Sequence, residues 1–354
     1  MTGIWETADT ITKARMNEKT IFQGTGSAIS GLASTYSGML AYCTSTGSGF
    51  TIDTLYVRNT ANTSWTALDI DSLFGDGSDG DVTISSNTDL GSSNKKNYNN
   101  LTINSGVYLT GNSPLIIRVS GVLTFASGTS IIKADGKGGA GGVNADGGSG
   151  GNGGGQVSIF ANTISGTGKV SSNGTDGGDV SGNAAGETAS VAGTGGYMAG
   201  SVNSASGGSA GLDVNDNRGG GGGAMAGNGG NGDTASGGTA HTTLPSNTLE
   251  ARYDGGGGGS AYHRGAVKKG GGGAGSGGFV RIYSVNNIPA VTLEAIGGIG
   301  GDSDTCAGGG GSGGIIWVFT LGTDSSTKSV TGGAAGTGGT PTAGSSGVTR
   351  SVIG

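Results

Sequence analysis

Three short stretches of one form decide the fold: GQVSIF at residues 155–160, GFVRIY at 278–283 and GIIWVF at 314–319. Each begins with glycine, continues with the β-branched and apolar residues typical of a strand, and ends in an aromatic residue. A glycine block precedes each stretch. We interpret the three as the first strands of three copies of a repeated unit.

A second short strand and another glycine block follow each first strand. An earlier copy, from Pro114 to Gly136, has the same two strands without a glycine entry. Self-similarity at a period of roughly 20–50 residues predicts a stacked architecture. The second strands are expected at 169–171, 291–295 and 328–330.

Composition excludes several classes of protein. The chain has 354 residues, of which 84 are glycine and only 4 are proline, and the glycines occur in blocks instead of at every third position as in collagen. A helical protein is disfavoured because each interior glycine costs a helix about 1 kcal/mol relative to alanine. Simple disorder is disfavoured by a net charge of −6 with 32% hydrophobic residues.

Charge and hydropathy limit the partners. Only 18 residues are basic, which argues against a nucleic-acid surface. The longest apolar run, 315–319, is far shorter than the roughly 20 residues that a membrane-spanning helix needs, so no membrane insertion is expected. Cys43 and Cys306 are too few for a disulfide framework or a zinc cluster. The first residues lack the basic and apolar regions of a signal peptide, so we expect assembly in a cytoplasm.

Four regions follow from the spacing of these features. The first is expected to be a small β module with a strand near 39–44 and a hairpin of 55–58 with 65–68, packed on aromatic residues. Further strands are expected at 81–84, 101–109 and 115–119. The regions are an N-terminal module (1–80), a β-repeat region (81–178), a glycine-rich insertion (179–276) and a C-terminal β-repeat region (277–354).

The glycine runs could form mobile loops or a packed array. Ordering glycine costs more backbone entropy than ordering any other residue, and it buries little side chain in return. In the packed alternative, polyglycine II, extended helices with three residues per turn bond to their neighbours. The fold class we predict is all-β: the small module, then β-solenoid or layered β-sandwich units with a polyglycine-II-like insertion.

The chain resembles virion appendage proteins. Its Trp5, Ile11-Thr12 and Met16-Asn17 are similar to the N-terminal segment of many tailed-virus fibres, and 44–50 to a small module of the same proteins. Residues 81–142 resemble a glycine-rich segment of phage and archaeal-virus appendage proteins. The insertion resembles the tip adhesins of T-even-like phages, in which loops between glycine runs contact the host receptor. The resemblance implies a virion location and docking through the N-terminal module.

Bulky side chains between the glycine runs are the candidates for receptor binding. Tyrosine and arginine are over-represented in binding hot spots, and no ordinary core demands them there. The alternative is that they cover the edges of the glycine region or contact another subunit. The candidate residues are Tyr197, Met225, Arg252, Tyr253, Tyr262, His263 and Arg264.

A weak calcium motif lies in the linker before the repeats. Asp76, Asp79 and Asp81 alternate with glycine turns, as in a calcium loop, but the twelfth-position glutamate is missing, and a plain turn is the alternative. No other cofactor is expected. Neither histidine has ligands at zinc spacing, and no nucleophile elbow or carboxylate pair stands out, so we do not expect an enzyme.

These observations predict a structural virion protein, a tail fibre or fibre tip, that attaches to a host surface glycan or protein by non-catalytic, multivalent binding. Open strand edges predict a homo-oligomer, for which a trimer is the expected form. One alternative is a purely structural component (a head fibre, capsid decoration or tail protein) without a receptor role. A cellular glycine-rich surface protein is a further alternative.

Overall fold

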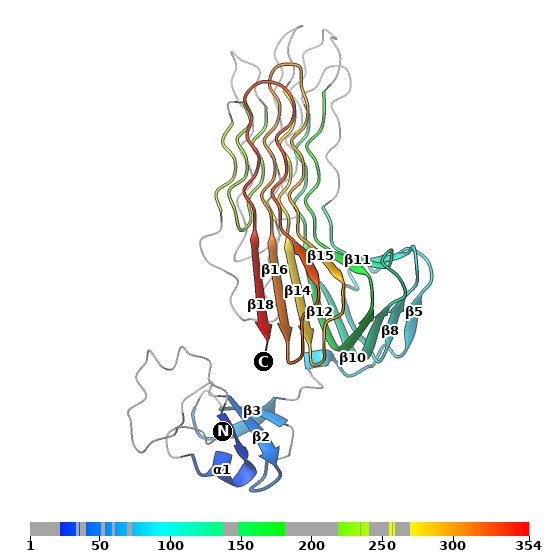
Figure 1. Ribbon diagram of the computed structural model, residues 1–354, viewed down its shortest axis with the longest axis vertical. Coiled ribbons are helices and arrows are strands. Elements are labelled where there is room, and N and C mark those ends of the chain that lie inside the picture. The colour runs from blue at the N-terminus through cyan, green and yellow to red at the C-terminus, as the bar shows by residue number, and fades with distance from the viewer. Residues whose placement is uncertain are drawn as a thin grey trace. The chain divides into compact units, whose positions relative to one another are not determined.

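The computed structural model is nearly all β and divides into two compact units, Met1–Leu73 and Phe74–Gly354. The boundary predicted from the sequence, between residues 80 and 81, lies seven residues after the observed boundary between residues 73 and 74. Figure 1 draws both units. The structure describes residues 22–32, 35, 40–50, 54–58, 61–68, 73–136, 148–180, 219–233, 235–240, 255–256, 258 and 270–353.

The N-terminal unit contains a four-stranded sheet in the order β1-β2-β3-β4. The predicted hairpin is confirmed, because β3 and β4 pair antiparallel with Arg58 opposite Trp65. Phe50 and Tyr56 are buried in its core, with Trp65 packed against them, as expected. Residues 1–21 and the side chain of Tyr42 lie outside the described residues. The elements are β1 (Phe22–Thr25), α1 (Gly26–Ser30), β2 (Leu40–Ser45), β3 (Thr54–Arg58) and β4 (Trp65–Leu68).

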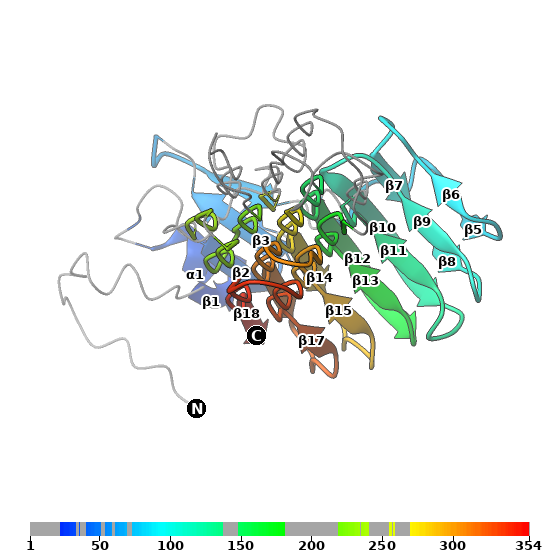
Figure 2. The same cartoon turned by 90° about the horizontal axis from the view of Figure 1, so that it is seen from above.

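Two parallel sheets build the C-terminal unit, and the chain alternates between them (Figures 1 and 2). We call them sheet C, in the order β18-β16-β14-β12-β10-β8-β5 with β7 also on β10, and sheet D, in the order β17-β15-β13-β11-β9-β6. Sheet C comprises β5 (Val82–Ile84), β7 (Lys95–Tyr98), β8 (Leu101–Ile103), β10 (Leu115–Phe125), β12 (Gln156–Gly166), β14 (Phe279–Ser284), β16 (Ile315–Thr320) and β18 (Val348–Ile353). Sheet D comprises β6 (Thr88–Asp89), β9 (Tyr108–Thr110), β11 (Ile131–Lys133), β13 (Lys169–Ser171), β15 (Thr292–Glu294) and β17 (Thr327–Ser329).

The repeat read from the sequence is confirmed strand by strand. The three glycine-led stretches are β12, β14 and β16, which pair in parallel so that Phe160, Tyr283 and Phe319 are in register. The second strands are β13, β15 and β17. One expectation is wrong: residues 101–109 are not a single strand. Gly106, at φ +75°, turns the chain there, so that β8 belongs to sheet C and β9 to sheet D.

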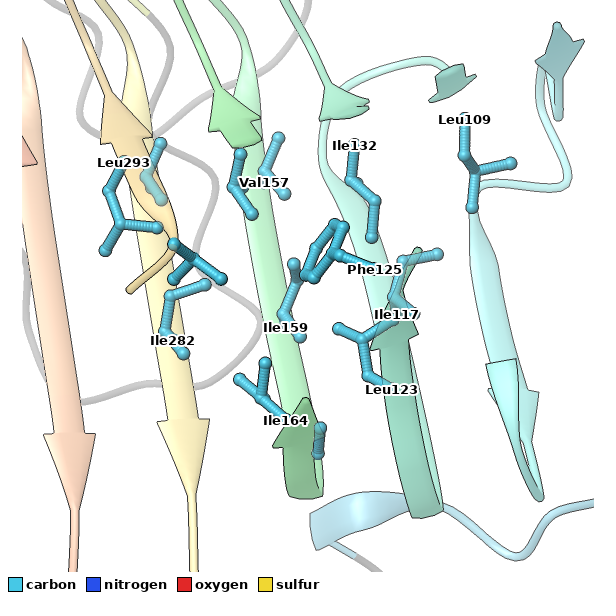
Figure 3. Close-up of a cluster of buried hydrophobic side chains, with 14 of the residues drawn as sticks. Leu109, Ile117, Leu123, Phe125, Ile132, Val157, Ile159, Ile164, Ile282 and Leu293 are labelled. Atoms are coloured by element: carbon cyan, nitrogen blue, oxygen red, sulfur yellow. The ribbon is translucent and has the colours of Figure 1, made fainter. Parts of the chain in front are cut away.

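The hydrophobic core lies between the two sheets (Figure 3). Alternate residues of sheet C, such as Ile117, Ile159 and Ile282, point inward and are buried. Leu109 and Leu293 of sheet D meet them from the other side (Figure 3). Alternation along the strands therefore supplies one apolar layer from each sheet, which is what fixes the register of the stack.

A glycine array continues from the strands of both sheets. It consists of chain segments that run beside one another, each visible end-on as a narrow coil in Figure 2. We call the end that joins the strands the strand end and the opposite end the far end. The described segments are 148–155, 172–180, 219–224, 228–233, 235–240, 255–256, 258, 270–278, 295–314 and 330–347.

Hydrogen bonds within the array repeat every three residues. The N–H groups of Gly271, Ala274 and Gly277 donate to one neighbouring segment at carbonyls 306, 309 and 312, each at 2.9 Å. The N–H groups of the residues that follow, Gly272, Gly275 and Gly278, donate to a second segment at carbonyls 178, 175 and 172. The carbonyls of 270, 273 and 276 accept from a third segment. Segment 270–278 is also bonded to segments 219–224 and 295–314, through the N–H groups of Gly220 and Gly301, so its backbone polar groups find partners on several sides.

The array is wider than the predicted insertion. Besides residues between 219 and 278, it includes glycine segments from 148–155, 172–180, 295–314 and 330–347. The N–H of Gly309 donates to the carbonyl of Gly220, for example, and that of Gly230 to Gly310. Segments of the insertion and of the repeats therefore form one hydrogen-bonded structure.

Candidate functional site

The far end of the array is a surface made of turns. The chain reverses at 302–306 and again at 336–340, and residue 233 lies beside the second turn. The N–H and hydroxyl of Thr340 both donate to Oδ1 of Asp233, at 2.8 and 2.9 Å. The N–H of Thr337 donates to Oδ1 of Asp302 at 2.6 Å. Side-chain oxygens thus fix turns from separate parts of the chain against one another.

A ladder of aspartate and asparagine side chains leads to this far end. Asn173, Asp176 and Asp179 stand three residues apart on one segment. Their Oδ1 atoms accept from the N–H groups of residues 296, 299 and 302 on the neighbouring segment, at 2.9, 2.7 and 2.8 Å. Because the array repeats every three residues, one side of each segment can carry these side chains while the other sides carry glycine.

Hydrogen bonding favours the ionised form of Asp233 at the far end. The backbone N–H of Thr340 is the main cause that holds the pKa of Asp233 below its ordinary value. Desolvation opposes this effect, whereas the Thr340 hydroxyl and the Cys306 thiol reinforce it. Asp302 and Asp304, in the adjacent turn, are exposed. The described part of the far end is therefore acidic and rich in hydrogen-bond acceptors.

Met225 does not have the exposed position expected of a receptor contact. Its side chain is buried in a cluster with Phe279, Ile315 and Trp317 on the outer face of sheet C. Its N–H donates to Oγ of Ser312 at 2.8 Å. The prediction is corrected for a physical reason: the segment descends from the array onto a sheet face that is apolar at this point, and methionine packs there.

The other six predicted receptor contacts lie outside the described residues: Tyr197, Arg252, Tyr253, Tyr262, His263 and Arg264. The described residues on either side of them do not all meet in one place. The carbonyl of Asp302 at the far end binds the N–H of Val180, which precedes Tyr197 in the chain. Gly270, which follows Arg264, is bridged to Cys306 at the same end. Gly255, just after Tyr253, instead donates to Gly154 at the strand end.

The three carboxylates of the calcium candidate face different partners. Asp76 accepts from the N–H of Ser78, and Asp79 from the N–H of Asn97 at 2.7 Å. Asp81 accepts from the side chain of Asn99 at 2.7 Å and from Asn100. The bonds of Asp79 and Asp81 join the linker to residues 97–100, whereas that of Asp76 stays within the linker. Within the described residues, no group of three or more metal-ligating side chains converges.

The outer face of sheet C carries an aromatic and cationic set whose stacking sequence reasoning missed. Phe160 and Tyr283 stack with ring centres 5.1 Å apart and planes at 12°, and Phe319 continues the row. In the neighbouring row, the Trp317 ring lies between the guanidinium groups of Arg281 and Arg350, at 5.9 and 5.7 Å. The signal was present: the aligned strands carry these residues at alternate positions, as outward-facing residues do.

No described helix is long and apolar enough to cross a membrane. No family model matches the chain, and neither the curated proteins nor the solved structures contain a significant match.

Proposed function

We propose that this chain is a subunit of a virion appendage, a tail fibre or fibre tip, that attaches the particle to the host surface without catalysis. The observation that carries the proposal is the glycine array, whose segments are joined by backbone hydrogen bonds that repeat every three residues. The array extends beyond the strands of both sheets (Figure 1), and such a support holds a surface away from its base. Attachment to a distant receptor requires that property.

The finer description of the fold belongs to the same proposal. We assign the alternating parallel sheets to a β-solenoid and the array to a polyglycine II bundle. The parallel pairing of equivalent strands supports the first assignment. The hydrogen bonds that repeat every three residues along neighbouring segments support the second. The array is then the rigid support, and the segments that leave it are the binding loops.

Rigidity favours binding in this arrangement. A loop whose ends are fixed by the array loses less conformational entropy when it meets a receptor than a loop on a mobile chain. Several weak contacts on one particle then sum to strong attachment. Residues 181–218 and 259–269 each join described segments at or toward the far end, where Val180 and Gly270 lie. We propose that the receptor, a surface glycan or protein, meets these segments.

A purely structural role in the virion is the second candidate. The observation that favours it is the open edge of sheet C at β18, a six-residue strand that is exposed over most of its length. An unpaired edge is a surface for assembly with another chain. In this case the N-terminal unit would dock onto the particle and the array would serve only as a spacer.

Two measurements separate these candidates. Gold-labelled antibodies against the chain locate it on particles by electron microscopy, and a position away from any virion appendage contradicts both. Purified protein is then added to the cells on which the particles are propagated. The attachment proposal expects adsorption to fall with protein concentration; unchanged adsorption at saturating protein contradicts it and leaves the structural role.

Variants then locate the contact. Replacing Tyr262, His263 and Arg264 together with alanine is expected to abolish the inhibition of adsorption. The matched control is Thr331→Ala, because Thr331 is exposed close to the end of β17, at the strand end of the array. If both proteins inhibit equally, the contact lies elsewhere, and the Arg252→Ala/Tyr253→Ala variant tests the segment that enters the array at its strand end.

A further inference from the structure

Strand β18 is the least protected edge of the C-terminal unit. Among the described strands it pairs with β16 alone, and it has six residues without proline or lysine. The other edge strands are short and carry or follow charged residues: β5 comes directly after Asp81, β6 contains Asp89 and β17 contains Lys328. Natural proteins use short strands and charges to block pairing at an edge. Among these described edge strands, β18 is the longest, and the guanidinium of its one charged residue, Arg350, lies over the Trp317 ring.

Exposed apolar side chains gather at the end of this strand. Val352 and Ile353 of β18 are 44% and 61% exposed, and Leu321, directly after β16, is 57% exposed. These are three of the five large apolar side chains that are exposed in the described part of the chain. They lie at adjacent positions, because Val352 pairs with Phe319 and Ile353 with Thr320. Val352 and Ile353 lie on opposite faces of the sheet, so the open edge has an exposed apolar side chain on each face, which indicates a site of association.

The hydrogen-bonding groups on the open side can be assigned by alternation. The N–H of Val348 donates to the carbonyl of Gly314, so this residue is bonded toward β16. By alternation, the backbone N–H and carbonyl groups of residues 350 and 352 also face β16. The N–H and carbonyl groups of Thr349, Ser351 and Ile353 therefore face away from β16 and toward the open side. An added strand would satisfy these groups.

We propose that β18 pairs antiparallel with β18 of a second copy of this chain, about a two-fold axis at Ser351. The outward backbone groups select this register: Ser351 lies opposite its own equivalent, and Thr349 opposite Ile353 of the second copy. Arg350 then lies opposite Val352, so no like charges are directly opposed. Each copy uses the same residues, as a two-fold interface requires.

The pairing agrees with the chemistry of both faces. On the outer face, the aliphatic part of Arg350, whose guanidinium stacks on Trp317, covers Val352 of the second copy. On the inner face, two serines meet at the axis, flanked by threonine and isoleucine. The exposed side chains of Val352 and Ile353 thereby gain partners on their two faces, and both sheets C become one continuous sheet. This two-fold pair differs from the trimer that the sequence suggested.

The first test measures mass and removes one backbone donor. Light scattering on the full chain is expected to give twice the chain mass of 33.7 kDa. Ser351→Pro removes an outward N–H and is expected to give the mass of a monomer, whereas Ser351→Ala loses the same hydroxyl but keeps the N–H and stays dimeric. A monomeric wild-type chain overturns the proposal, as does a folded Ser351→Pro chain that remains dimeric.

The second test reads the register and does not depend on how well the proline variant folds. Directly opposed residues of a hydrogen-bonded pair have Cα atoms about 5.5 Å apart, which suits a disulfide. Ser351→Cys is expected to form a disulfide-linked dimer on oxidation, and Thr349→Cys only when mixed with Ile353→Cys. The native thiols, Cys43 and Cys306, are buried. Equal crosslinking of Thr349→Cys alone overturns this register.

Failure of this inference is distinct from failure of the attachment proposal. A monomer that still inhibits adsorption overturns the dimer and leaves attachment intact. A dimer with the expected crosslinks that does not inhibit adsorption contradicts the attachment proposal and leaves the dimer intact.

Discussion

Gly311 and Gly275 lie on neighbouring segments of the glycine array so closely that a Cβ on Gly311 would collide with the carbonyl oxygen of Gly275. The backbone N–H of Gly311 donates to the carbonyl of Gly298 at 3.0 Å. A shift of the segment away from Gly275 would therefore cost this hydrogen bond. Glycine is required here because backbone packs directly on backbone.

Gly311→Ala is therefore expected to lower the free energy of unfolding by about 1–3 kcal/mol or more, as overpacking does in a close-packed interior. Denaturant unfolding followed by far-UV circular dichroism measures the change. The control is Gly128→Ala, since Gly128 is exposed, has no positive φ and has no atom within 4 Å of an added Cβ. It should be neutral or slightly stabilising. Equal losses in both variants would refute the packing argument.

The stacked row on sheet C gives a second prediction. Tyr283 lies between Phe160 and Phe319, with ring centres at 5.1 and 5.6 Å. Tyr283→Ala removes both ring contacts and is expected to cost about 1–3 kcal/mol, because the side chain is half-buried. Tyr283→Phe keeps the ring and should stay within about 0.5 kcal/mol of the wild type. If the phenylalanine variant loses as much, the hydroxyl group and not the ring is responsible.

The carboxylate ladder gives a third prediction. Asp302 accepts from the N–H of Thr337 and donates its own N–H to Asp179, which links three segments. Asp302→Ala leaves the Thr337 N–H without this acceptor and is expected to cost about 1 kcal/mol in thermal or denaturant unfolding. Asp304→Ala, in the same turn, removes an exposed carboxylate without a described partner and should change stability by less than about 0.5 kcal/mol. A larger effect at Asp304 would contradict the ladder.

The fourth prediction concerns high pH. Burial, with a smaller effect of the Asp79 charge, raises the pKa of Tyr98 to about 12. The unfolded chain loses this phenolic proton near its ordinary pKa of about 10, and the folded chain holds it longer. The contribution to stability is therefore complete below pH 10 and is lost between about pH 10 and 12.

Absorbance titration near 295 nm should show one tyrosine that ionises about two pH units later than the exposed ones. Tyr98→Phe should abolish that late step and flatten the fall in stability above pH 10. A wild-type chain whose tyrosines all ionise together near pH 10 would show that Tyr98 is not buried as described.

Much of the fold could be predicted from local pattern. β-branched runs entered by glycine and closed by an aromatic residue gave β12, β14 and β16, because a strand buried on one face needs that alternation. Local pattern failed at Gly106, where a turn separates β8 from β9. The apolar residues of the two strands alternate on both sides of the turn, and they therefore predict one strand. The short helix α1 was missed as well, since its five residues carry no apolar period.

The candidate site was less predictable. Bulky residues between glycine runs were grouped as one binding cluster, but the sequence does not say at which end of the array each run begins. Met225 turned out to pack on Trp317, because the segment that carries it ends on sheet C. The stacking of Arg281 and Arg350 on Trp317 joins residues from three strands and depends on their register.

The sequence by itself determined that the chain would be β-structured, repeated and dependent on glycine, because strand alternation and the absence of side chains are local properties. Only the tertiary structure decided which segments are neighbours. The N–H of Gly275 donates to Thr175, and that of Gly309 to Gly220, across long stretches of chain. A glycine run presents the same backbone on every side, so its partners are chosen by the strands that anchor its ends and not by its own residues.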